Sequence, residues 1–195
     1  MTKLLSILIL TCATLHAQSV ILQASSAGNV RGTGAGNVGG VAVESTAITT
    51  NTYCDGRFEI RSDNTNVVLD TGSGWTWTRD ANIDGQKDWT NSVNYCVNLT
   101  NATYSDWRLP SVTELSRDAA DGSTNGLVDA GVSANEPALP LGHPFVNVQS
   151  VEYWTSTEAP LGDPGTAWTV DLSNGMLNGF PNKVDVKYVW PCRGP

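Results

Sequence analysis

The chain has 195 residues, and its 11 Lys and Arg against 19 Asp and Glu give a formal net charge of 11 − 19 = −8. This charge disfavours nucleic acid and anionic membranes as partners, because both would repel the protein. With only two His in the chain, histidine-based metal sites and histidine-based catalysis are nearly excluded.

Residues 1–17 have the pattern of a secretory signal peptide. Lys3 provides a short positive start, residues 4–15 are mostly apolar, and Ala17 is a small residue suited to cleavage. The apolar run is too short to cross a bilayer comfortably. We therefore expect a secreted or cell-surface protein, periplasmic or extracellular, with no membrane insertion after signal removal. A lipoprotein signal at Cys12 and an N-terminal anchor helix are the weaker alternatives.

Residues 18–50 are rich in Gly, Ser and Thr and poor in large side chains. The sequence Ala-Gly-Asn-Val occurs at 27–30 and again at 35–38, and two copies are too few for a solenoid. We interpret this stretch as an arm or linker. The composition changes after it, so residues 51–195 are predicted to form the folded domain.

The first half of this domain predicts short strands followed by a helix. Residues 58–60 and 67–69 are strand-like runs around a turn, and residues 75–78 alternate as a half-buried strand does. The period then changes over residues 88–99. There one helical face carries the side chains of Trp89, Val93, Cys96 and Val97.

The second half predicts one more short helix and a return to strands. Ser111 and Glu114 form a capping box that opens the helix, with Val112 and Leu115 inward. Residues 121–150 have a loop composition. Three further strands are expected, at 152–156, 167–172 and 187–193. An Asn-Gly pair at 174–175 predicts a type I′ hairpin turn. The fold class is therefore α+β, with a mainly antiparallel sheet and two short helices.

Three cysteines remain after signal removal, and they favour one disulfide plus one thiol. A Cys96–Cys192 disulfide would close a loop of nearly a hundred residues and contribute roughly 4–5 kcal/mol to stability. Cys54 with Cys192 is the competing pair, and three thiols are the remaining alternative.

Residues 80–88 match the first half of a calcium loop. Asp80, Asn82, Asp84 and Asp88 offer oxygen ligands around Gly85. Position 12 of the loop is Asn rather than Glu, however, so an Asx-rich turn is the simpler interpretation. We expect no cofactor, with calcium at this loop as the alternative.

Several motifs resemble one known family. The chain reads DWRLPSVTEL at 106–115, GHPFVNVQS at 142–150, YWTST at 153–157 and YVWP at 188–191. Together they are similar to the Lcl C-terminal domain family, named for a domain of the Legionella collagen-like adhesin. The resemblance covers about residues 54–194. It implies a C-type-lectin-like fold in an exported bacterial protein, and a homotrimer.

The resemblance implies a binding role without catalysis. The sequence between and before the last strands offers polar loop residues as ligand contacts: Glu158, Asp163, Asn174, Asn178, Asn182, Lys183 and Asp185. Six other residues are expected to be structural: Asp106, Trp107, Arg108, Trp154, Trp168 and Trp190.

Three functions follow, in order of preference. The first is an adhesin-like module that binds a glycan or a surface protein. The second is an assembly domain of a surface protein. The third is a cysteine-dependent oxidase, which rests on analogy with the formylglycine-generating enzymes alone.

Overall fold

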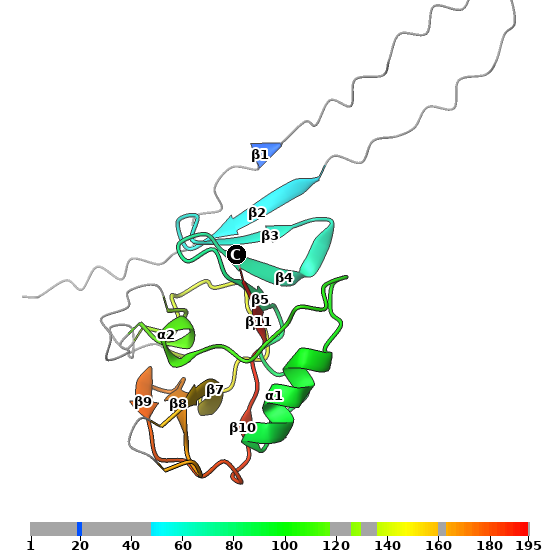
Figure 1. Ribbon diagram of the computed structural model, residues 1–195. Helices are drawn as coiled ribbons and strands as arrows, with labels where there is room; N and C mark the ends of the chain where they lie inside the picture. Colours follow the sequence, from blue (N-terminus) through cyan, green and yellow to red (C-terminus); the bar gives the residue numbers. More distant parts are fainter. Residues whose placement is uncertain (1–18, 21–47, 118–125, 130–135, 160–162, 195) are drawn as a thin grey trace, which may run out of the picture.

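A computed structural model of the chain describes residues 19–20, 48–117, 126–129, 136–159 and 163–194. The predicted signal peptide and nearly all of the predicted Gly-rich arm lie outside these residues. Figure 1 shows the strands gathered into separate groups, with the helices beside them. None of the helices in the described residues is long and apolar enough to cross a membrane.

Among the described residues, the first sheet has six strands in the order β1-β2-β3-β4-β5-β11, and all of its pairings are antiparallel. Its members are β1 (Ser19–Val20), β2 (Thr49–Tyr53), β3 (Phe58–Arg61), β4 (Asn64–Asp70), β5 (Thr76–Thr78) and β11 (Cys192–Arg193). The predicted runs at 58–60 and 67–69 are confirmed as β3 and β4. Their turn is tighter than expected, since β4 already begins at Asn64.

The second sheet has five strands in the order β6-β10-β7-β8-β9. Its members are β6 (Gln86–Lys87), β7 (Glu152–Glu158), β8 (Ala167–Asp171), β9 (Met176–Asn178) and β10 (Lys187–Tyr188). The pairing of β10 with β7 is parallel, and the other pairings in this sheet are antiparallel. Within the residues that the structure describes, two sheets with two short helices confirm the α+β class. The C-type-lectin-like fold stays a prediction.

Both predicted helices are present, with the predicted caps. Helix α1 spans Trp89–Asn98, and the Asp88 carboxylate accepts the backbone N–H of Asn91 at 2.9 Å. Helix α2 spans Val112–Leu115 and has the capping box of Ser111 and Glu114. One detail is wrong: the side chain of Val97 is 61% exposed, whereas Val112 is half-buried.

The predicted strand over 187–193 is divided between the two sheets. Its first part is β10 and its last part is β11. Pro191, between them, has no backbone N–H to give to a ladder. The intervening Trp190 is fully buried, and its ring centroid lies 4.9 Å from Phe145 and 5.7 Å from both Trp77 and Tyr153. This tryptophan therefore occupies the centre of the main core.

The predicted hairpin at Asn174-Gly175 is present, and it joins β8 to β9. A type I′ turn needs positive φ at both central residues. Here only Gly175 has positive φ, at 75°, so the predicted turn type is wrong. The loop is instead closed by backbone bonds from Asn174 and Gly175 to the carbonyl oxygen of Asp171, at 3.3 and 2.7 Å.

Candidate functional site

The C-terminal loops carry the residues predicted to bind a ligand, and several of those side chains are engaged within the protein. Lys183 pairs with Glu158 at 2.8 Å and also donates to the carbonyl oxygen of Pro164. Its ammonium lies 4.3 Å from the ring centroid of Trp89. The amide of Asn178 donates to Glu152 at 2.8 Å. These contacts position the loops against β7 and α1.

The other predicted ligand residues shape turns. Asp163 accepts the backbone N–H of Gly165, and Asn174 accepts that of Met176. Asp185 accepts the backbone N–H of Asn182 at 3.2 Å. A carboxylate or amide used in this way fixes a turn. The assignment of ligand binding to these residues stays a prediction.

The same loops expose apolar side chains that are not among the predicted ligand contacts. Phe180 and Val184 are each 83% exposed, and Val186 is 56% exposed. Large exposed apolar side chains grouped in one segment are typical of contact surfaces. Nothing in the periodicity of residues 179–186 distinguishes them from core residues.

The predicted calcium ligands do not converge. Asp80 accepts the backbone N–H of Asn82 and the side-chain amide of Asn147. Asp84 pairs with Lys87 at 2.6 Å, and Asp88 caps helix α1. Within the described ranges, no cluster of three or more His, Cys, Asp or Glu side chains could hold a metal ion. The geometry is that of an Asx-rich turn.

The predicted disulfide is absent from the structure. Cys96 and Cys192 are both thiols. Cys96 packs with Leu109 and Trp154 in a smaller cluster, whereas Cys192 packs in the main core on β11. Burial raises the pKa of the Cys96 thiol to about 12, and burial also raises the pKa of Cys192. Cys54, the competing partner, directs its Sγ toward the carbonyl oxygen of Leu141 at 3.3 Å.

The residues predicted to be structural make contacts within the fold. Asp106 pairs with Arg193 at 2.7 Å, and Arg108 forms two 2.7 Å bonds to Glu114. Arg108 also lies over the ring of Trp75. Trp107, Trp154 and Trp190 are buried, while Trp168 is half-buried. The DWRLP motif therefore connects helix α2 to β11.

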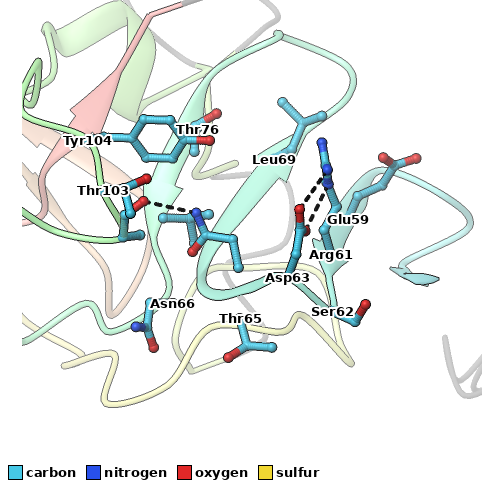
Figure 2. A pocket seen from close by; sticks show the side chains of 13 residues that line it. Glu59, Arg61, Ser62, Asp63, Thr65, Asn66, Leu69, Thr76, Thr103 and Tyr104 are labelled. Atoms are coloured by element: carbon cyan, nitrogen blue, oxygen red, sulfur yellow. Dashed lines mark hydrogen bonds and ion pairs between the residues drawn. The ribbon is translucent and has the colours of Figure 1, made fainter. Parts of the chain in front are cut away.

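A groove of about 520 Å³ lies on the first sheet, between the β3–β4 hairpin and the turn at 101–104. We call it the hairpin groove. Figure 2 shows Tyr104 and Thr76 toward one end and Arg61 with Asp63 toward the other. The two sides are connected, because the side-chain amide of Asn64 donates to the carbonyl oxygen of Ala102 at 3.1 Å. No motif in the sequence indicated this groove.

The turn that forms one wall has an uncommon backbone. Ala102 and Thr103 have φ of 56° and 71°, and neither is glycine. Asn101 and Tyr104 exchange both backbone hydrogen bonds at 3.0 Å, which is the arrangement of a type I′ turn. Positive φ at a β-branched residue costs roughly 1–2 kcal/mol. The structure therefore maintains a strained turn at the edge of the groove.

The family model of the Lcl C-terminal domain matches residues 66–193. The chain belongs to the Lcl C-terminal domain family. A comparison with curated proteins found no match.

The Lcl C-terminal domain match includes both helices, the whole second sheet, and β5 and β11 of the first. It begins at Asn66, inside β4. Strand β3 and the turn between β3 and β4 therefore precede the matched region. The hairpin groove combines a wall inside the match, at 101–104, with a wall that lies before it.

Proposed function

We propose that this protein is an exported, non-catalytic binding module of the adhesin type, at the cell surface or secreted. The observation that carries the proposal is its membership of the Lcl C-terminal domain family, over residues 66–193. That family takes its name from a collagen-like adhesin. The predicted signal peptide supports export.

The buried thiols and the histidine support binding rather than catalysis. A thiol whose pKa is far above neutral carries little thiolate, and thiolate is the nucleophilic form. Burial raises the pKa of both Cys96 and Cys192 in this way. Burial lowers the pKa of His143, which keeps its imidazole neutral and lodged beside Phe145. The two thiols belong to the core clusters, and His143 packs beside Phe145.

The ligand we propose is a glycan or a surface protein, and the charges argue against a sulfated polyanion. Except for Arg79, every basic side chain in the described part of the chain pairs with a carboxylate. Arg79 donates to the carbonyl oxygens of Pro144 and Thr65. Paired cations attract a polyanion weakly, and the net charge of the chain repels it.

The contact surface we propose comprises the C-terminal loops at 173–186. Phe180 and Val184 stand out from them, and the internal bonds of Asn178 and Lys183 hold the loops in place. A fixed loop loses little conformational entropy on binding. In a C-type-lectin-like domain such loops would present a variable surface, and a homotrimer would present several copies.

Binding assays with the purified protein after signal removal test the proposal. The protein is applied to a glycan array with and without EDTA, to immobilised extracellular matrix proteins and to heparin. We expect a ligand that EDTA does not affect, and elution from heparin below about 0.3 M salt. A Phe180→Ser/Val184→Ser variant should bind a protein ligand more weakly, whereas an Asn94→Ala variant on α1 should not change. Failure on every ligand would contradict the proposal and favour the assembly role.

A further inference from the structure

The polar side chains of the hairpin groove differ from those of the C-terminal loops in how they are used. Four side chains that line the groove make no hydrogen bond or ion pair within the described residues. They are those of Glu59, Asn66, Thr76 and Thr103. The same holds for the hydroxyl of Tyr104. In the C-terminal loops, by contrast, Glu158, Asn178 and Lys183 are all bonded internally. The groove therefore offers donors and acceptors that the fold does not consume.

From this contrast we propose that the hairpin groove binds a neutral glycan, meaning an oligosaccharide without sulfate or carboxylate groups. The inference goes beyond the proposed function: it adds a second contact site, apart from the C-terminal loops, and specifies the ligand class for that site. A sugar ring presents hydroxyls around its rim and a C–H face that is apolar. The groove matches the first feature with amide, hydroxyl and carboxylate groups, and the second with the aromatic ring of Tyr104.

The dimensions of the groove suit a short oligosaccharide. Its volume of about 520 Å³ falls within the range of small-molecule sites in proteins. The lining is mixed: Leu69 and Val67 of β4 contribute apolar surface between the polar walls. A site of this kind gains affinity from apolar contact and specificity from a few placed polar groups.

The charges in the groove select against anionic sugars. Arg61 is held by Asp63 through two bonds, at 2.8 and 3.1 Å. That pair leaves the carboxylate of Glu59 uncompensated, so the groove has a net negative charge. A sulfate or uronate group would be repelled by Glu59, whereas a sugar hydroxyl can donate to it.

The groove is also held in shape before any ligand arrives. The Asn64–Ala102 bond joins the hairpin to the strained turn, and Arg193 lies 4.0 Å from the ring centroid of Tyr104. Asp106 holds that guanidinium in turn. A preformed site avoids the entropic cost of ordering its walls on binding.

Titration calorimetry with a neutral oligosaccharide tests the inference. The probe is the strongest uncharged binder on the glycan array. We expect Glu59→Ala and Asn66→Ala each to weaken its affinity by about tenfold, a factor that corresponds to the loss of one good hydrogen bond. Asn94→Ala, an exposed asparagine change on α1, is the matched control and should stay within about twofold. Thermal denaturation verifies that each variant is folded.

The outcomes separate this inference from the proposed function. Loss of neutral-glycan binding in the groove variants, with binding retained in Phe180→Ser/Val184→Ser, supports the groove. No neutral-glycan binding by the unaltered protein overturns it, as does binding that the groove variants leave unchanged. Neither of these results affects the proposed function if the protein binds a matrix protein through its C-terminal loops.

Discussion

The indole nitrogen of Trp190 donates a hydrogen bond to the carbonyl oxygen of Thr78 at 2.9 Å. The next residue completes the connection, because the backbone N–H of Thr78 donates to the carbonyl oxygen of Pro191 at 3.2 Å. Trp190 follows β10 of the second sheet, and Thr78 ends β5 of the first. This pair of bonds therefore couples the two sheets inside the core.

Trp190→Phe should lower the free energy of unfolding by about 2–3 kcal/mol. The substitution removes the indole donor and part of the core volume, and it leaves the buried carbonyl of Thr78 without its side-chain partner. Urea titration followed by circular dichroism measures the effect. Trp75→Phe is the control, since Trp75 is only half-buried. Equal losses in both variants would contradict the special role of the Trp190–Thr78 bond.

The elements predicted best from the sequence are those that depend on residues close together in the chain. The caps at Asp88 and Ser111 and the runs of β3 and β4 are local signals, and the structure confirms them. The segment 187–193 shows where local signals fail. It has the composition of one strand, but β10 pairs with β6 and β7 while β11 pairs with β5. Residues far away in the sequence decide which strand such a segment pairs with.

Stability should fall in acid partly through Glu114. Burial opposes the ionisation of this carboxyl, but the bonds from Arg108 and the backbone N–H of Ser111 outweigh it and lower its pKa. A carboxyl whose pKa is lower in the folded state stabilises the protein above its unfolded pKa, and this contribution is lost as pH falls through the folded pKa. Glu114→Gln should cost about 1–2 kcal/mol at neutral pH.

Melting temperatures between pH 7 and pH 3 test this prediction. The unaltered protein should lose more stability over this range than Glu114→Gln does, because the variant has already lost the carboxylate. Glu59→Gln serves as the control, since it removes a carboxylate that has no partner among the described residues. A Glu114→Gln variant with the same pH profile as the unaltered protein would refute the assignment.

The two buried thiols should resist alkylation in the folded protein. Burial excludes the reagent and keeps both groups protonated at pH 8, because it raises the pKa of Cys96 to about 12 and that of Cys192 as well. We expect iodoacetamide to modify Cys96 and Cys192 only after unfolding, as measured by peptide mass spectrometry. If modification also required a reductant, the predicted Cys96–Cys192 disulfide would be present in the protein in solution.

Thr103→Gly should stabilise the fold by about 1 kcal/mol. Glycine adopts positive φ without the steric cost that a β-branched residue incurs, and this gain exceeds its larger entropy in the unfolded chain. Thr103 has φ of 71°. Thr65→Gly, on the exposed part of β4, is the control and should destabilise. A loss of stability in Thr103→Gly would show that the threonine side chain contributes contacts that offset its strain.

The candidate groove could not have been predicted from the sequence. Its walls come from residues 59–66 and 101–104, and no motif marks either segment as a partner of the other. The type I′ turn in its wall uses Ala102 and Thr103 rather than the Asn-Gly pair that predicts such a turn. The sequence patterns instead indicated the C-terminal loops, since polar residues between strands are the familiar signal of a binding surface.

The order of the elements has a consequence for how the chain folds. The strands that complete both sheets, β10 and β11, come after all the others, and Trp190 meets a partner 112 residues earlier in the chain. Contacts between residues this far apart in sequence slow folding, because a long loop must close, at a cost in entropy, before the stabilising contact forms. Until β11 pairs with β5, one edge of the first sheet is therefore unpaired. Truncation before Lys187 should yield a species that aggregates through that edge rather than a smaller folded domain.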